Sequence, residues 1–308
     1  MIFPDHIRAA HDAGAFLRRV DRARLRLTGA DRLPYLHGLL TNDVAALPPG
    51  TSRYAALLTA QGRMIADMNV HELGEATIIE LESPLAGPVR EHLDRFVITE
   101  DVVVEDVTGI LAQVGVYGPD AARLVDGLPA AGRWPTTDTG LDGFEVLVPS
   151  ETVGDFEAAL EARGAMRIGP ETRELARIEA GIPRFLVDMD TTTIPLEAGI
   201  EDRAISMTKG CYVGQEVIVR VLHRGGGRVA RKLVGLRAAS EVSRDDRLWS
   251  GEREIGRITS AVASPRFGPI ALGYVQRDFV EPGTELTVKR NGTDVTVVVG
   301  SVPFTRPT

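Results

Sequence analysis

The sequence predicts an α+β protein in which two mixed lobes precede a β-rich domain. Before residue 222, strand-like and helix-like segments are mixed without a regular strand–helix alternation, and the same order of segments occurs twice. After residue 229, only short strand-like segments follow. With 308 residues, 44% of them hydrophobic, the chain can bury the cores of two or three domains. We therefore expect a two-lobed α+β region over 1–222, its lobes interleaved, and an antiparallel β-barrel domain over 229–308.

The first lobe opens with apolar residues at helical spacing, which predict a helix over 13–20. Alternation at 25–27 predicts a strand, and Asp31 and Pro34 suit the opening of a second helix. Strands are expected over 54–59, 64–71 and 76–82. Ser83 and Pro84 then suit the start of a helix that ends near Phe96.

The second lobe repeats this order. Strands are expected near 102–105, 111–117 and 144–148. A helix follows Ser150 and is stopped by Gly164, and another is opened by Pro170 and stopped by Gly181.

The C-terminal region carries frequent turn signals and no helix signal. Glycine-rich signals separate its short strands at Gly251, Gly256, Gly268, Pro282-Gly283 and Asn291-Gly292. The triple glycine at 225–227 favours a flexible or tightly turned junction over a phosphate-binding loop, because no strand–GxGxxG–helix context surrounds it.

Composition narrows the possible partners and metal sites. The chain has 35 basic and 43 acidic side chains, a formal charge of −8, which disfavours nucleic acid as a partner. No apolar run approaches the roughly 18 residues of a membrane span, and the N-terminus lacks a secretory signal, so we expect a cytoplasmic protein. The single cysteine excludes an intrachain disulfide and a four-cysteine cluster, and the scattered histidines predict no metal site.

The most informative segment is residues 209–216, Lys-Gly-Cys-Tyr-Val-Gly-Gln-Glu. A neighbouring cation such as Lys209 favours the thiolate of Cys211, the form that attacks electrophiles and binds metals. Cys211 and Lys209 are therefore the candidate catalytic residues. The alternative is an ordinary thiol buried in a loop between packed elements.

This segment resembles the signature of the YgfZ branch of the YgfZ/GcvT family, which is related to the glycine-cleavage T-protein aminomethyltransferases. Other stretches in the same order are similar to that family: 36–44, 61–67, 177–183, 194–199 and 256–275. The resemblance implies three domains in a ring around a channel that binds a tetrahydrofolate.

The resemblance also implies contacts to that folate. Glu197 stands where T-proteins place the glutamate that binds the pterin, whose two-donor edge suits a carboxylate; the alternative is a carboxylate at a helix start. Arg203, Lys209, Arg220 and Arg228 are candidates for the anionic tail. Tyr212, in the signature, is also a candidate folate contact.

Asp67 is the last candidate folate contact. The family's Gly-Gly-Xaa-Xaa-Asp-Asp stretch corresponds to 62–67 here, where Arg63 replaces a glycine and Ala66 replaces the first aspartate. Because strand side chains alternate between faces, Asp67 is not expected to replace the missing carboxylate. This departure argues against glycine-cleavage activity.

These observations lead to one main functional hypothesis and two alternatives. The main hypothesis is a tetrahydrofolate-binding accessory protein in iron–sulfur cluster assembly or repair, with iron–sulfur proteins or assembly factors as partners. The first alternative is a folate-dependent aminomethyltransferase or other one-carbon transfer enzyme. The second is a folate-binding scaffold without catalysis.

Overall fold

The computed structural model describes residues 4–136, 138–224, 226, 228–290 and 293–305, and the chain divides into two compact units. Unit 1 consists of residues 1–137, 141–172 and 202–215, and unit 2 of residues 138–140, 173–201 and 216–308. Each unit is described by itself. Within the described residues, no helix is both long and apolar enough to cross a membrane.

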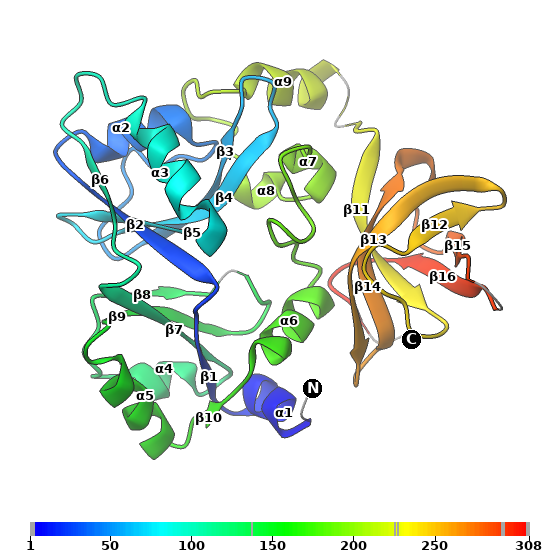
Figure 1. The fold of residues 1–308 in the computed structure, drawn as a ribbon, viewed down its shortest axis with the longest axis horizontal. Helices are drawn as coiled ribbons and strands as arrows, with labels where there is room; N and C mark the ends of the chain where they lie inside the picture. Colours follow the sequence, from blue (N-terminus) through cyan, green and yellow to red (C-terminus); the bar gives the residue numbers. More distant parts are fainter. Residues whose placement is uncertain (1–3, 137, 225, 227, 291–292, 306–308) are drawn as a thin grey trace. The chain divides into compact units, whose positions relative to one another are not determined.

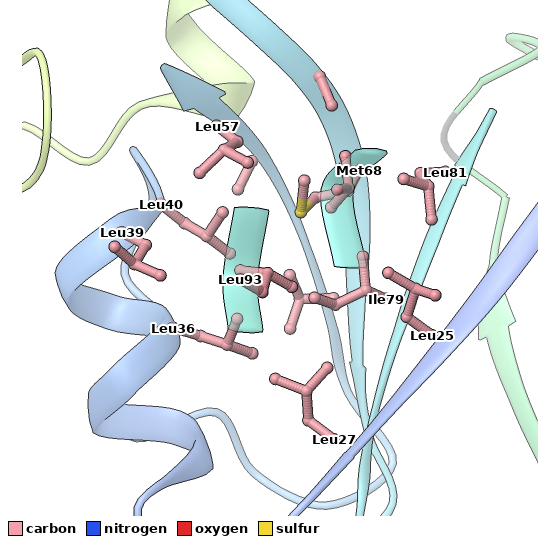
Figure 2. Packing of buried hydrophobic residues seen from close by; sticks show 14 of the residues in the cluster. Leu25, Leu27, Leu36, Leu39, Leu40, Leu57, Met68, Ile79, Leu81 and Leu93 are labelled. Atoms are coloured by element: carbon pink, nitrogen blue, oxygen red, sulfur yellow. The ribbon is translucent and has the colours of Figure 1, made fainter. Parts of the chain in front are cut away.

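The first sheet of unit 1 has the strand order β3-β4-β5-β2-β6 and is antiparallel throughout (Figure 1). Its strands are β2 (Arg22–Thr28), β3 (Ser52–Leu58), β4 (Met64–Glu72), β5 (Thr77–Glu82) and β6 (Val103–Asp106). Helices α2 (Arg32–Leu39) and α3 (Ala86–Asp94), the latter preceded by the turn η1 (Ser83–Leu85), pack on one face. Figure 2 shows Leu36 of α2 and Leu93 of α3 meeting Leu25, Met68 and Ile79 of the sheet.

The second sheet of unit 1 has the order β10-β1-β7-β9-β8. Its strands are β1 (Ala15–Arg18), β7 (Leu111–Tyr117), β8 (Gly132–Pro135), β9 (Gly143–Pro149) and β10 (Met166–Arg167), and β10 pairs parallel to β1. Helices α4 (Ala121–Val125) and α5 (Val153–Ala162) cover one face with a core that includes Phe16 and Leu160. Helix α1 (Pro4–Asp12) precedes β1.

Unit 2 contains a closed barrel of six antiparallel strands in the order β11-β14-β13-β12-β15-β16. They are β11 (Arg231–Ala238), β12 (Arg247–Ser250), β13 (Arg253–Ser264), β14 (Gly268–Gln276), β15 (Glu285–Val288) and β16 (Val295–Gly300), with the turn η3 (Arg277–Phe279) after β14. Alternate side chains such as Leu236, Ile258 and Val297 fill its interior. Closure leaves the barrel without an open edge, as the strand-rich sequence predicted.

The remaining helices lie between the second sheet and the barrel in sequence. They are α6 (Pro170–Glu179), α7 (Pro195–Ala198), α8 (Glu201–Ala204), α9 (Gln215–Val219) and the π-type turn η2 (Arg220–Arg224). Helix α6 begins and ends within two residues of the predicted Pro170 and Gly181. Gly225, Gly227 and the predicted turn Asn291-Gly292 lie outside the described residues.

Three element predictions were wrong. Residues 15–18 form strand β1 rather than a helix, and Val20 is 81% exposed, because pairing with β7 and β10 overrides a short pattern that fits either period. The strand near 102–105 joins the first sheet through β2 instead of opening the second lobe. Gly256 lies inside β13 rather than in a turn, where a Cβ atom would meet the Tyr274 carbonyl oxygen at 2.1 Å.

Candidate functional site

Asp67 lies on the polar face of the first sheet. Its neighbours in β4, Ala66 and Met68, belong to the hydrophobic core under α2 and α3, and Figure 2 shows Met68 pointing into it. The expected alternation of positions 66 and 67 is therefore confirmed. However, an aspartate at position 66 would point into an apolar core, away from the face that carries Asp67. The departure at this position therefore does not argue against glycine-cleavage activity, contrary to the expectation from the sequence. The replacement by Ala66 removes no carboxylate from the polar face.

The Asp67 carboxylate has one satisfied and one unsatisfied oxygen. Tyr54 Oη donates a hydrogen bond to Oδ2 at 2.7 Å, whereas Oδ1 is buried and has no partner among the described residues. Asp67 is only 6% exposed. Burial raises the pKa of Asp67, and the charge of Arg22 and the Tyr54 hydrogen bond oppose this shift only in part. A carboxyl group in this state can take up and release a proton.

Arg22 is the nearby cation, but two other carboxylates engage it. Its Nε donates to Glu80 at 2.8 Å and its Nη1 to Glu82 at 2.9 Å, and all three side chains are buried. His71 Nε2 lies 3.1 Å from Glu80 Oε2. Because Glu80 and Glu82 balance the guanidinium charge, Asp67 is left without an ion-pair partner of its own within the described chain.

Tyr54 connects Asp67 to a cavity of about 710 Å³ within unit 1. The walls include Asn42, Asp43, Tyr54, Asp202 and Arg203. The guanidinium of Arg203 lies 4.4 Å from the centre of the Tyr54 ring, a cation–π distance. The structure thus brings Asp67 and Arg203 together through Tyr54.

The Thr41-Asn42 pair fixes the segment that carries Arg203. Asn42 Nδ2 donates to the carbonyl oxygens of Tyr54 at 2.8 Å and of Arg203 at 2.9 Å. Thr41 Oγ1 donates to the Ala204 carbonyl at 2.6 Å and accepts from the amide of Ala56 at 2.9 Å. These bonds attach residues 203–204 to the edge strand β3, so this motif has a structural function.

Lys209 caps a helix instead of facing the thiol, which corrects the expectation that it activates Cys211. Its ammonium group donates to the carbonyl oxygens of His37, Leu40 (2.6 Å) and Asn42 (3.2 Å), at the C-terminal end of α2. Burial lowers the pKa of Lys209 to about 8. Lys209 Nζ also lies 5.1 Å from the centre of the Tyr212 ring, and both residues are buried.

Cys211 is exposed. The interpretation of Cys211 as a reactive thiol requires this exposure, whereas the alternative predicted a buried thiol. Gly214 of the same segment has φ +84° and sits against the turn between β3 and β4, where a Cβ atom would lie 2.4 Å from the Thr59 carbonyl oxygen. Among the described residues, no group of three or more His, Cys, Asp or Glu side chains could hold a metal ion.

Glu197 lies in unit 2, in the first turn of α7. Its Oε2 accepts a hydrogen bond from the Ile194 amide at 3.4 Å, the geometry of a helix-start carboxylate. The same oxygen accepts two bonds from Arg231, at 3.2 and 3.3 Å. Glu197 is only partly buried, so the helix-start role leaves it accessible to a ligand.

The other two predicted arginines differ in their contacts. Arg220 pairs with Glu216 across one turn, and both side chains are largely exposed. Arg228 is exposed and has no ion-pair partner among the described residues. Sequence reasoning missed Tyr54 and Arg231, because a single tyrosine in a strand and one arginine among many carry no local signal.

Two segments of the chain match known family descriptions. Residues 13–133 match "GCVT N-terminal domain", and residues 231–305 match "Glycine cleavage T-protein C-terminal barrel domain". An aminomethyltransferase from Synechocystis sp. is 30% identical over 297 residues, which cover 86% of this chain and 78% of the relative. The chain belongs to the glycine cleavage T-protein family.

Other comparisons agree with this family. An aminomethyltransferase from Rubrobacter xylanophilus is 30% identical, over 90% of this chain and 79% of the relative. One from Streptomyces coelicolor is 29% identical, over 97% of this chain and 88% of the relative. The glycine cleavage system aminomethyltransferase T of Bartonella henselae has the same fold, with a TM-score of 0.87 at 21% identity, over 99% of this chain and 91% of that one. The predicted α+β T-protein-like fold with a C-terminal antiparallel barrel is confirmed.

Proposed function

We propose that this protein binds tetrahydrofolate and transfers a one-carbon unit, of the aminomethyl type, to or from it. The observation that carries the proposal is the Asp67–Tyr54 pair, with the unsatisfied Oδ1 of Asp67 on the polar face. Aminomethyl transfer to a folate moves protons on and off amine nitrogens. A buried carboxyl group with a raised pKa suits that task.

In this proposal the residues have separate tasks. Asp67 exchanges the proton, and Tyr54 orients its carboxylate. Glu197 accepts the two-donor edge of the pterin, while Arg203, Arg220 and Arg228 are the candidates for the anionic tail, because guanidinium groups bind carboxylates in a forked geometry. Tyr212, which lies buried beside the Lys209 ammonium group, is a further candidate for contact with the folate. The names of the relatives support this reaction class.

The experiment measures binding and transfer separately. Calorimetry with tetrahydrofolate should give saturable binding. An aminomethyl-lipoyl donor should then yield methylene-tetrahydrofolate, with release of ammonia and the dihydrolipoyl group. We expect Asp67→Asn to abolish most of the transfer and to leave most of the binding. Wild-type protein that does not bind tetrahydrofolate would contradict the proposal, and binding without any transfer would leave a folate-binding scaffold.

The exposure of Cys211 favours a second candidate function. In this alternative the protein belongs to the YgfZ branch and supports iron–sulfur cluster assembly or repair through its thiol, with the partner protein supplying the other cluster ligands. The variant Cys211→Ala separates the two candidates. If one-carbon transfer survives this substitution, the result supports the transferase. If the protein transfers no one-carbon unit but needs the thiol to deliver a cluster, the result supports the iron–sulfur function.

A further inference from the structure

Arg231 and Glu197 form a pair at the junction of α7 and the barrel. Arg231 is the first residue of β11, and its Nε and Nη2 atoms donate to Glu197 Oε2 at 3.3 and 3.2 Å. The guanidinium carbon lies 4.7 Å from the centre of the Tyr274 ring. Arg231 is thus held by an aromatic face and directed at one carboxylate oxygen.

The contacts of Glu197 are unevenly divided between its oxygens. Both bonds from Arg231 and the bond from the Ile194 amide fall on Oε2. Within the described ranges, no donor reaches Oε1. A carboxylate offers about four lone-pair positions, so Oε1 keeps its capacity to accept hydrogen bonds from a ligand.

We infer that Arg231 is a positioning residue for ligand recognition: it fixes the carboxylate of Glu197 so that Oε1 faces a ligand with two adjacent N–H donors. A 2-amino-4-oxopyrimidine ring, as in a pterin, presents such an edge. This inference rests on the proposed function and adds a residue to it. A lysine would supply charge but neither the fork nor the stacking on Tyr274.

The competing explanation is that the pair only attaches α7 to β11. Its bonds are 3.2 and 3.3 Å long, and the side chains of Arg231 and Glu197 are 32% and 14% exposed. Partly exposed pairs of this kind contribute little to stability. If the pair were merely structural, removing it would leave the affinity for the ligand unchanged. The two residues would then show no coupling in ligand binding.

The experiment is a double-mutant cycle measured by calorimetry with tetrahydrofolate. The variants are Arg231→Met, Arg231→Lys, Glu197→Gln and the double variant Glu197→Gln/Arg231→Met. The control is Arg247→Met, which removes an exposed arginine that pairs with Glu254 at 3.1 Å in the same barrel.

We expect Arg231→Met to weaken binding about tenfold or more, as expected for loss of a charge-assisted contact, with an unchanged melting temperature. Arg231→Lys should restore part of the affinity, and the double variant should bind no more weakly than Glu197→Gln alone. Arg247→Met should bind like wild type.

Two results would overturn the inference. Either Arg231→Met binds as tightly as wild type, or its effect adds fully to that of Glu197→Gln, so that the residues act independently. Both results leave the proposed function intact. Wild-type protein without affinity for tetrahydrofolate overturns the proposed function and this inference together.

Discussion

At the scale of single residues, burial decides the chemical character of Asp67. The side chain shares a sheet face with Arg22, yet the guanidinium group of Arg22 donates to Glu80 and Glu82. Within the described part of the chain, Tyr54 is the one side chain that donates to Asp67. Its charged form is therefore poorly compensated in the folded state. A group whose ionisation is disfavoured by folding is suited to proton transfer and costs stability.

Asn in place of Asp67 should separate these two effects. Burial raises the pKa of Asp67 above its unfolded value, so ionisation costs folding free energy at neutral pH, and this cost is lost as pH falls through the folded-state pKa. We expect Asp67→Asn to melt at or above the wild-type temperature at pH 7, with the difference shrinking in acid. Transfer should fall about 10²–10⁴-fold. The control is Asp94→Asn, at an exposed position of α3. An Asp67→Asn variant that melts well below wild type at pH 7 would contradict this account.

The two glycines of the signature segment offer a matched pair. Gly214 has φ +84°, and an added Cβ would lie 2.4 Å from the Thr59 oxygen, whereas nothing lies within 4 Å of a Cβ at Gly210. We expect Gly214→Ala to lower the free energy of unfolding by about 2 kcal/mol or more, and Gly210→Ala to change it by less than about 0.5 kcal/mol. Urea denaturation measures both, and equal effects would show that the close approach is unimportant.

At the scale of elements, the C-terminal end of α2 depends on a residue about 170 positions away. The last carbonyl groups of a helix lack partners within it, and Lys209 supplies three donors to this end. Residues 39–42 (Leu-Leu-Thr-Asn) and residues 209–212 (Lys-Gly-Cys-Tyr) therefore pack together, although they are far apart in sequence.

Methionine at position 209 preserves the length of the side chain and removes its donors. We expect Lys209→Met to destabilise the protein by about 2–4 kcal/mol, because the carbonyl groups of His37, Leu40 and Asn42, at and just beyond the end of α2, lose a charged partner. Lys232→Met, at an exposed position, should change stability by less than about 0.5 kcal/mol. Chemical denaturation compares the two variants, and a small loss for Lys209→Met would mean that water replaces the ammonium group.

At the scale of the whole molecule, buried polar groups join the central segment of unit 2 to its barrel. Arg177 of α6 donates to Asp188 at 2.8 Å and to Ser260 Oγ at 2.7 Å. Asp188 also accepts from the hydroxyl groups of Thr259 and Ser260. Residues 173–201 and strand β13 are thus held by one network with little exposure to solvent.

Removal of Asp188 should be among the most damaging single changes. Asp188→Ala removes the fully buried carboxylate partner of Arg177, which keeps only the partly exposed Glu174, and breaking a buried pair of this kind costs about 3–5 kcal/mol. The control is Glu254→Ala, which breaks an exposed pair with Arg247 and should cost under about 1 kcal/mol. Thermal and urea unfolding report both changes; comparable losses for the two variants would contradict this role for the network.

The strand and helix pattern of the sequence predicted most elements of this fold. Strand β7 was predicted to the residue, and β3, β4, β5, α5 and α6 within a few residues, because their periodicity and terminal signals are local. Helix α4 and strands β8 and β10 are short and have no such signal. The strand at 15–18 was missed because four residues fit either period, and only pairing with β7 decides between them.

The sequence by itself determined the T-protein-like family, the fold class and the barrel, since these depend on local pattern and on ordered motifs. It also named Asp67, Glu197 and Cys211 as candidate site residues. Only the tertiary structure decided what these residues contact. It directed Asp67 to the polar face beside Tyr54, engaged Lys209 with α2 and placed Arg231 against Glu197. Such contacts join residues distant in sequence, and no local spacing encodes which donor will reach which acceptor once the chain has folded.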